Sequence, residues 1–331
     1  MSNPLMRAWQ VKALTEPPSL ALCDIERPTP LDDECLLRVE ACGLAFGDTL
    51  LVRGRYQVKP QLPFVPGSEV VGTVVETCAG GPPVGTRIAS SCQQGGLAEF
   101  ARVPGRFVVP LSNGMPAGAA LALRSNFPTA LYALREVARL RAGETVLVHA
   151  GSGGVGSAAV TLARWMGARV LATAGGAEKV AAVRTLGAHE VVDYRADDWI
   201  DAVRRLAPSG VNVVFDPVGG DVGVQSLRCL VFGARYLIVG FAGGELTALP
   251  ANRLLLHNAT AHGVLWGEVR KRDADLAKRL TRDVYDAHSQ GELSLLSGQA
   301  FPFEQAPQAL AALHERRSVG KLWLELRRAS H

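Results

Sequence analysis

The sequence has no long hydrophobic run, no cluster of basic residues and no C-x-x-C motif, and each absence excludes a class of protein. No apolar stretch approaches the ~20 residues that a membrane-spanning helix needs. The N-terminus, Met-Ser-Asn-Pro-Leu-Met-Arg, lacks the apolar core of a signal peptide, so we expect a cytoplasmic protein. The net charge is +4, but Lys and Arg are scattered rather than grouped, which argues against a nucleic-acid partner.

The cysteine content and the composition are typical of a folded protein with reduced thiols. The six cysteines form no repeating framework, so we expect no disulfides. Hydrophobic residues make up 48% and charged residues 20% of the chain, which excludes a largely disordered protein. At 331 residues the chain has about twice the length of a usual domain, and we expect two domains.

The first 125 residues are rich in glycine, proline and short β-branched runs. Proline and glycine separate these runs at short intervals, which predicts a β-rich domain with many turns. The expected strands are Glu34–Val39, Val70–Glu76, Arg87–Ala89 and Phe100–Val103.

From about residue 126, apolar strands alternate with amphipathic helices. This alternation predicts βαβ units and a doubly wound parallel sheet. The expected strands are Thr145–Ala150, Arg169–Thr173, Glu190–Asp193, Val211–Phe215 and Ala234–Phe241. The expected helices are Gly154–Met166, Glu178–Leu186, Asp197–Leu206 and Asp221–Leu230.

The C-terminal part is a short mixed segment that we expect to return to the first domain. It contains a charged helix, a strand, a second helix and a last strand, at Glu268–His288, Gln299–Phe303, Ala306–Arg316 and Lys321–Leu326. The predicted domains are therefore residues 1–125 with 266–331, and residues 126–265.

The strongest local signal is a glycine-rich turn between an expected strand and an expected helix. Gly151, Gly153 and Gly156 fit the pattern G-x-G-x-x-G, and Ser152, Gly154 and Val155 complete the turn. In this context the glycines permit a tight turn, a close approach of a pyrophosphate and close helix packing, and the helix N-terminus attracts the phosphates. The alternative is a turn that binds nothing. No Gly-Lys-Ser/Thr follows, which excludes a kinase-like P-loop.

The second strand of the parallel sheet indicates which dinucleotide is bound. NAD-preferring sites carry an acidic residue at its end, but here it ends in Ala174, Gly175 and Gly176. A carboxylate ~4 Å from a 2′-phosphate would cost roughly 4 kcal/mol at an effective dielectric constant of 20. We expect Lys179 and Tyr194 to contact that phosphate, the alternatives being a solvated lysine and a surface tyrosine. NADPH is the expected cofactor.

Five sequence blocks resemble the medium-chain dehydrogenase/reductase superfamily, and specifically its zinc-independent quinone oxidoreductase branch. They are Val-Pro-Gly-Ser-Glu-Val-Val-Gly72, His149-Ala-Gly-Ser-Gly-Gly-Val-Gly156, Leu186-Gly-Ala-His-Glu-Val-Val-Asp-Tyr194, Phe215-Asp-Pro-Val-Gly-Gly220 and Val239-Gly-Phe-Ala242. The resemblance implies an α/β protein with a central doubly wound Rossmann domain and a β-rich GroES-like catalytic domain. It also implies an active site between the domains.

The positions that bind zinc in the alcohol dehydrogenase branch carry no suitable ligands here. Ala45 and Ser68 stand at two of these positions, and residues 124–129 offer no Cys, His or Asp near the third. A catalytic zinc needs three protein ligands. The four-cysteine structural zinc loop is also missing, since residues 85–109 contain only Cys92. We expect no metal.

Without a Lewis acid, reduction of a quinone or an α,β-unsaturated carbonyl is easier than oxidation of an alcohol. Hydride transfer then requires positioning and hydrogen-bond donors. The resemblance implies catalytic roles for Tyr56, Asp48 and Arg53. It also implies cofactor contacts for Asn126, Thr129, Phe241, Trp266 and Lys321. Each has a plainer alternative as a surface, helix-capping or core residue, and His149 is interpreted as a core histidine.

The leading hypothesis is an NADPH-dependent, metal-free reductase of quinones or α,β-unsaturated carbonyls. The alternatives are an enoyl-thioester reductase and a non-catalytic NADPH-binding or RNA-binding protein. We also expect a homodimer, because the segment from Arg253-Leu-Leu-Leu-His257 to Gly263-Val-Leu-Trp266 is apolar enough for an edge strand that a partner covers.

Overall fold

The computed structural model describes residues 4–196 and 198–326 and divides the chain into two compact units. Unit 1 comprises residues 1–125 and 297–331, and unit 2 comprises residues 126–296. Asp197, the first residue of one expected helix, lies outside the described residues, as do the chain ends 1–3 and 327–331 of the expected first domain. Within the described part of the chain, no helix has the length and hydropathy required to cross a membrane.

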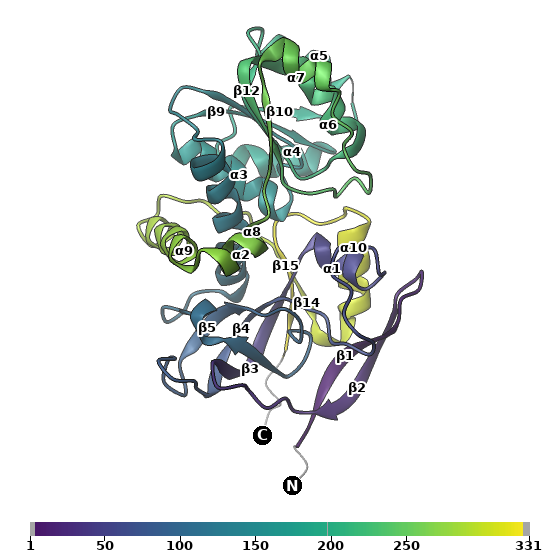
Figure 1. Ribbon diagram of the computed structural model, residues 1–331, viewed down its shortest axis with the longest axis vertical. Coiled ribbons are helices and arrows are strands. Elements are labelled where there is room, and N and C mark those ends of the chain that lie inside the picture. The colour runs from purple at the N-terminus through teal and green to yellow at the C-terminus, as the bar shows by residue number, and fades with distance from the viewer. Residues whose placement is uncertain (1–3, 197, 327–331) are drawn as a thin grey trace. The chain divides into compact units, whose positions relative to one another are not determined.

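Unit 1 is built on a sheet in the order β14-β15-β3-β4-β5-β7, with β6 paired to β3 (Figure 1). Its strands are β3 (Glu34–Leu44), β4 (Glu69–Glu76), β5 (Arg87–Ser91), β6 (Phe100–Pro104), β7 (Val109–Pro110), β14 (Gln299–Pro302) and β15 (Leu322–Glu325). The last strand, β15, pairs antiparallel with β3, so that Leu324 lies opposite Cys42. The C-terminal segment therefore returns to the first sheet, as the sequence predicts.

Short helices and a separate hairpin complete unit 1. The hairpin consists of β1 (Leu5–Ala13) and β2 (Ser19–Glu26), and the helices are α1 (Phe46–Leu51), η1 (Gly105–Phe107), η4 (Phe303–Gln305) and α10 (Ala306–His314). The indole of Trp9 donates a 2.8 Å hydrogen bond to the carbonyl of Phe303, which joins the hairpin to the C-terminal segment. The core contains residues from both ends of the chain, including Val11, Leu37 and Leu310.

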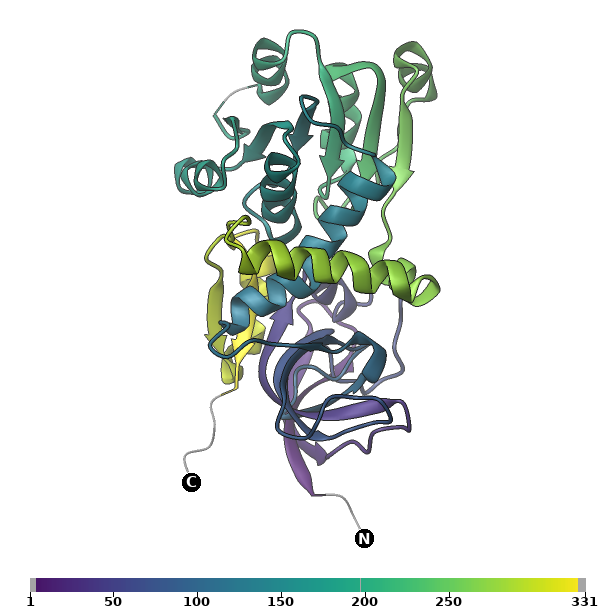
Figure 2. The same ribbon diagram turned by 90° about the vertical axis from the view of Figure 1, so that its left-hand side faces the viewer.

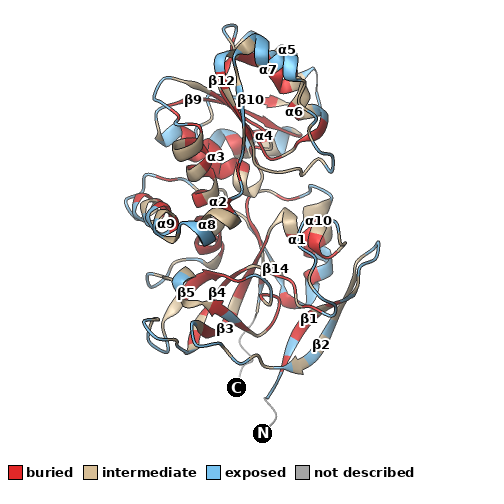
Figure 3. Cartoon of the chain, viewed as in Figure 1, coloured by how far each residue is buried: buried red, intermediate tan, exposed pale blue. Residues whose placement is uncertain are grey.

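Unit 2 contains a six-stranded parallel sheet in the order β10-β9-β8-β11-β12-β13. The strands are β8 (Thr145–Val148), β9 (Arg169–Ala174), β10 (Glu190–Asp193), β11 (Val211–Asp216), β12 (Leu230–Ile238) and β13 (Thr260–Gly263). The helices between them are α3 (Gly154–Trp165), α4 (Ala177–Thr185), α5 (Trp199–Leu206), α6 (Gly220–Ser226), η3 (Leu227–Cys229) and α7 (Ala251–His257). The strand order changes direction between β8 and β11, which is where such sheets bind ligands. The central strands are buried, as Figure 3 shows in red.

The charged segment before residue 297 differs from its prediction in two ways. It forms two helices, α8 (Trp266–Arg272) and α9 (Ala274–Ser289), instead of one. Asp273 separates them because its carboxylate accepts a 2.9 Å hydrogen bond from the amide of Leu276 and so caps α9. In addition, residues 266–296 belong to unit 2, whereas the sequence analysis grouped them with the N-terminal domain.

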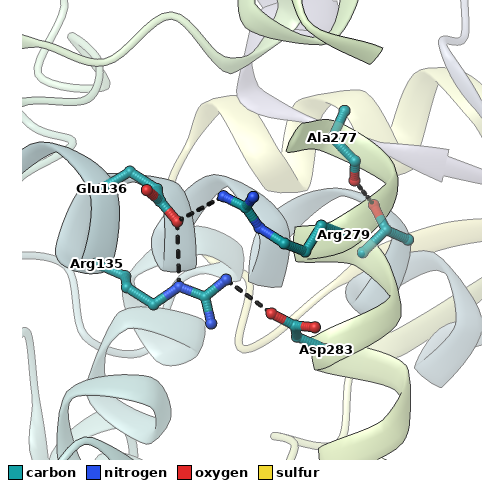
Figure 4. Close-up of polar contacts among 6 residues, drawn as sticks. Arg135, Glu136, Ala277, Arg279 and Asp283 are labelled. Atoms are coloured by element: carbon teal, nitrogen blue, oxygen red, sulfur yellow. Dashed lines mark hydrogen bonds and ion pairs between the residues drawn. The ribbon is translucent and has the colours of Figure 1, made fainter. Parts of the chain in front are cut away.

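Ion pairs show why this segment belongs to unit 2. Helix α2 (Ala117–Leu131) continues into the π-helical turn η2 (Tyr132–Val137), and within unit 2 α9 lies beside η2 (Figure 2). Arg135 lies 2.7 Å from Asp283, and Arg279 lies 3.4 Å from Glu136 (Figure 4). Within α9, the Thr281 hydroxyl donates a 2.8 Å hydrogen bond to the Ala277 carbonyl.

The segment expected as a partner-covered edge strand is only partly a strand. Residues 253–257 lie in helix α7, and β13, at the edge of the sheet, begins at Thr260. Leucine favours helices more than strands, and Asn258 ends α7 with a left-handed backbone, φ 46°. The expectation of a strand at residues 253–257 was therefore wrong.

Candidate functional site

The turn between β8 and α3 has a backbone that requires glycine. The Gly151 amide donates to the Thr173 carbonyl at 2.9 Å, and the Gly153 amide donates to the Ala150 carbonyl at 2.9 Å. A Cβ atom at Gly156 would collide with the carbonyl oxygen of Ala150. A Cβ at Gly151 would lie 3.1 Å from the Cβ of Ala172. The first and third glycines of the motif thus permit close packing of strand and helix.

Helix α3 begins at this turn, and no side chain caps its first turn. Its N-cap is Gly153, which supplies no side-chain cap, so Gly154, Val155 and Gly156 form an uncapped N-terminus. The amide nitrogen of Asn126 would lie 2.6 Å from a Cβ at Gly154, so this side chain packs directly on the helix start. Partial positive charge at such an N-terminus attracts anions such as phosphate.

The turn after β9 brings together residues from two neighbouring strands. A Cβ at Gly175 would lie 2.5 Å from the Tyr194 hydroxyl and 3.0 Å from Nε of Arg195. Arg195 was not predicted from the sequence. Asp193 also lies here, and its Oδ1 accepts hydrogen bonds from the amides of Gly176 at 3.0 Å and Arg195 at 2.9 Å. These amides lower the pKa of Asp193, so the turn holds one carboxylate beside the Arg195 cation.

Four other residues predicted to contact the cofactor occupy different places in unit 2, whereas Lys321 lies in unit 1. Lys179 is half-buried in the first turn of α4 and Thr129 lies near the end of α2. Phe241 packs on Gly219, in the turn that follows β11, where a Cβ would lie 2.6 Å from its ring. Trp266 is buried, with its ring centroid 5.8 Å from that of Tyr132 in η2.

His149, at the end of the buried strand segment, is a satisfied core residue. Its Nδ1 lies 3.0 Å from the Thr173 hydroxyl and its Nε2 lies 2.7 Å from the Ser226 hydroxyl. The Ser226 hydroxyl donates to the carbonyl of Val222, so it accepts a hydrogen bond from Nε2–H of His149. Burial lowers the pKa of His149, which keeps the ring neutral.

Unit 1 contains a separate cluster of buried polar side chains. Lys321, just before β15, forms a buried ion pair with Glu69, the first residue of β4. Gly43 makes room for this pair, since a Cβ there would lie 2.9 Å from both the Glu69 carboxylate and Cε of Lys321. Asp48 is buried in α1 and accepts a 2.7 Å hydrogen bond from the amide of Ala45.

Burial and charge change the protonation of this cluster. Desolvation raises the pKa of Asp48 to about 6, and the nearby Glu69 carboxylate adds to the shift. Desolvation, with Asp48 and Glu69 nearby, also raises the pKa of the Cys42 thiol well above its ordinary value. Neither Cys42 nor Glu69 was predicted as a site residue, although Glu69 lies in the block Val-Pro-Gly-Ser-Glu-Val-Val-Gly72.

Two of the three predicted catalytic residues lie together, and the third is engaged elsewhere. The ring of Tyr56 packs on Gly47, where a Cβ would lie 3.2 Å from its Cε2. Burial and the Asp48 charge raise the pKa of Tyr56, which keeps its hydroxyl protonated. Arg53, in contrast, pairs with Glu16 at 3.0 Å and donates to the Thr49 carbonyl at 2.9 Å.

The donor set of unit 1 does not fit a catalytic zinc. Ala45 has no donor atom, Glu69 is neutralised by Lys321, and Asp48 is committed to the Ala45 amide. Across residues 4–196 and 198–326, no three His, Cys, Asp or Glu side chains are grouped so that they could hold a metal ion. A tetrahedral site with three protein ligands cannot be assembled from these atoms.

Comparisons with known proteins identify the family of the chain. Residues 31–113 match the alcohol dehydrogenase GroES-like domain family, and residues 154–282 match the zinc-binding dehydrogenase family. The chain is 34% identical to quinone oxidoreductase-like protein 2 of Bos taurus, over 93% of this chain and 92% of that protein.

Solved structures give the same result. The quinone oxidoreductase of Thermus thermophilus, which was solved with NADPH, is 36% identical, with a TM-score of 0.86 over 97% of this chain and 100% of that chain. The CurK enoyl reductase is 25% identical, with a TM-score of 0.86 over 98% of this chain and 100% of that chain.

Proposed function

The chain belongs to the quinone oxidoreductase branch of the medium-chain dehydrogenase/reductase superfamily, and on that premise we propose that it is an NADPH-dependent reductase of quinones or α,β-unsaturated carbonyls that works without a metal ion. The observation that carries this proposal is the uncapped N-terminus of α3, built on glycines that leave no room for side chains. It is a phosphate site of the kind that dinucleotides require.

Two turns of unit 2 would hold NADPH. The amides of Gly154, Val155 and Gly156 would bind the pyrophosphate, with Asn126 supporting the first turn of α3. Tyr194, Arg195 and Lys179 would bind the 2′-phosphate beside Gly175. When bound, NADPH supplies the hydride. The Arg195 cation offsets the Asp193 carboxylate, which otherwise would repel the phosphate.

Tyr56 and Asp48 are the residues of unit 1 that we assign to the reaction. The protonated Tyr56 hydroxyl would donate a hydrogen bond to the carbonyl oxygen of the acceptor and stabilise the negative charge that develops there. The final proton would come from solvent or from Tyr56. Asp48 lies near Tyr56 and fixes the start of α1 through the Ala45 amide. Arg53 would act by holding the segment before Tyr56 through Glu16 and Thr49.

The absence of zinc ligands limits the substrate class. Oxidation of an alcohol requires a group that stabilises the alkoxide, and Ala45 and Ser68 cannot recruit a Lewis acid for it. A quinone or an enone is already electrophilic, so positioning and one hydrogen-bond donor suffice. The similarity to the CurK enoyl reductase favours a second candidate function, reduction of an enoyl thioester.

The test combines cofactor binding with an acceptor panel. NADPH and NADH are titrated separately, and quinones, 2-alkenals and enoyl thioesters are then screened by the loss of NADPH absorbance. We expect turnover with quinones or 2-alkenals. Turnover with thioesters alone would establish the enoyl reductase. NADPH binding without any turnover would leave a non-catalytic protein, and salt-sensitive retention on single-stranded RNA would then indicate the RNA-binding alternative.

A matched pair of tyrosine variants tests the role of Tyr56. Tyr56→Phe removes the hydroxyl and is expected to lower kcat about 100-fold or more, because loss of one oxyanion donor has an effect of that order. Tyr285→Phe, in α9, removes a hydroxyl outside the proposed site and is expected to leave kcat unchanged. Equal kcat values for the two variants would overturn the assignment.

We propose in addition that the protein forms a homodimer through the β13 edge of the parallel sheet. β13 ends the described sheet, and the neighbouring α7 exposes Leu255 at 80% and Leu256 at 68%. Unpaired strand edges and exposed leucines are typical of interfaces. Light scattering is expected to give twice the chain mass, and the variant with Leu255→Glu and Leu256→Glu is expected to shift it toward the monomer.

A further inference from the structure

Two cysteines that no predicted function uses lie in contact at one end of the unit 1 sheet. Sγ of Cys35, in β3, is 3.2 Å from Sγ of Cys78, which follows β4. The antiparallel register places Leu36 opposite Glu76, so Cys35 faces the chain where it leaves the ladder. Cys35 is completely buried, whereas Cys78 is partly exposed in a turn whose tip, Ala79 and Gly80, faces solvent.

This geometry is close to that of a disulfide. Bonded sulfur atoms lie about 2.05 Å apart, so these sulfurs need to approach by only about 1 Å. We propose that Cys35 and Cys78 are an oxidation site and that they form an intrachain disulfide when the protein meets a small-molecule disulfide such as oxidised glutathione.

The reaction consists of two balanced exchange steps. The Cys78 thiolate attacks one sulfur of oxidised glutathione, which forms a mixed disulfide and releases one reduced glutathione. The Cys35 thiolate then attacks the Cys78 sulfur and releases the second reduced glutathione. Two cysteine thiols are oxidised, one glutathione disulfide is reduced, and the two thiol protons end on the two glutathione molecules.

The surroundings favour completion of the second step. A Cβ at Gly105 would lie 2.5 Å from the Cys78 sulfur, and a Cβ at Gly81 would lie 2.9 Å and 3.0 Å from the sulfurs of Cys78 and Cys35. Thr77 donates a 2.7 Å hydrogen bond to the Pro82 carbonyl, which folds the turn over the pair. Backbone thus lies close to both sulfurs and holds Cys35 in contact with Cys78, so Cys35 displaces glutathione wherever its thiol is present.

The pair differs from a catalytic dithiol. Burial and the adjacent Cys35 thiol raise the pKa of Cys78, so it lacks the stabilised thiolate that thiol–disulfide oxidoreductases use. Cys35 also lies eight positions before Gly43 on β3, roughly 25 Å from the Glu69 and Lys321 cluster at the strand rise of about 3.3 Å. Oxidation would therefore fasten the turn after β4 to β3 without touching the proposed catalytic residues.

The test treats the reduced full-length protein with oxidised glutathione, blocks free thiols and sequences the linked peptides by tandem mass spectrometry. The expected product has lost two hydrogens, links Cys35 to Cys78, and unfolds at a higher temperature than the reduced protein. Cys23→Ser is the matched control and should form the same link, because Cys23 lies in β2 and its thiol faces the carbonyl of Ala21.

Single variants separate the two steps. Cys35→Ser is expected to stop at a stable glutathione adduct on Cys78. Cys78→Ser, a change in the exposed turn that preserves the buried Cys35, is expected to give no link and no rise in unfolding temperature. The proposal is overturned if the wild-type protein keeps glutathione on Cys78, or if another cysteine pair links at an equal rate. Neither result bears on NADPH turnover, which is measured separately.

Discussion

The polar site of unit 2 is formed by backbone groups, whereas the polar site of unit 1 is formed by side chains. In unit 2 the α3 turn is made of backbone amides, and its requirement is that side chains be absent at Gly151 and Gly156. In unit 1 the cluster is made of side chains, and its requirement is that Lys321 and Glu69 neutralise each other out of water. Addition of a side-chain atom should therefore disrupt the α3 turn of unit 2, whereas removal of one charge should destabilise the buried cluster of unit 1.

The largest effect is expected from breaking the buried ion pair. Lys321→Met leaves the Glu69 carboxylate buried without its partner, which should lower the free energy of unfolding by about 3–5 kcal/mol. Urea denaturation at neutral pH measures it. The surface pair of Arg272 and Glu268 is the control, because it is exposed to solvent and Arg272→Met is expected to change the free energy of unfolding very little. Equal losses would show that burial does not distinguish the two pairs.

A second, smaller effect concerns the Asp48 carboxyl in the same cluster. Its pKa is raised from 3.8 to about 6, so between these values the native state holds more protons than the unfolded state. Stability must then fall as pH rises through this window, by up to about 3 kcal/mol above pH 7. Asp48→Asn keeps an oxygen for the Ala45 amide and removes this loss.

Denaturation curves at several pH values check this prediction. The variant with Asp48→Asn should approach the wild-type stability near pH 4 and exceed it at neutral pH. Parallel stability curves for the two proteins would contradict a raised pKa. The glycine turn of unit 2, Gly151–Gly156, contains no titratable side chain. This pH dependence is therefore expected from the unit 1 cluster and not from that turn.

The third prediction concerns a methyl group added to the glycine turn between β8 and α3. Gly156→Ala forces a Cβ against the Ala150 carbonyl, and we expect a loss of about 1–3 kcal/mol in stability together with weakened NADPH binding. Gly267→Ala, in α8, is the matched control because a Cβ there meets nothing within 4 Å. It should be neutral or stabilising by up to about 1 kcal/mol. Melting temperature and NADPH fluorescence titration measure both variants.

The same contrast explains how much the sequence could predict. The parallel strands were recognisable because burial on both faces makes the central ones mostly apolar, and the predicted Val211–Phe215 differs from β11 (Val211–Asp216) by one residue. The β1–β2 hairpin was not identified as two strands because half-exposed residues interrupt its apolar pattern. The break at Asp273 depends on one capping hydrogen bond, which periodicity does not reveal.

For the candidate site, local geometry was predictable and distant pairing was not. The glycine turn is contiguous in sequence, so its spacing carried the prediction. Glu69 and Lys321 are 252 positions apart, and only the folded sheet brings them together. Arg195 was missed although its neighbour Tyr194 was predicted, because only the folded turn shows that the guanidinium also lies against Gly175.

The smallest expected effect comes from a comparison of two charges in one turn, the Arg195 guanidinium and the Asp193 carboxylate. The guanidinium lies at Gly175, while the neighbouring Asp193 carboxylate is held by the amides of Gly176 and Arg195. The Arg195 cation would attract a 2′-phosphate, and the Asp193 carboxylate would repel it. Removal of the cation should therefore lower the affinity for a cofactor that carries this phosphate. Arg195→Ala is expected to weaken NADPH binding about tenfold, or about 1.4 kcal/mol, and to leave NADH binding unchanged. Arg184→Ala, at the far end of α4, should change neither, and equal weakening of both cofactors by Arg195→Ala would mean that the guanidinium does not contact the phosphate.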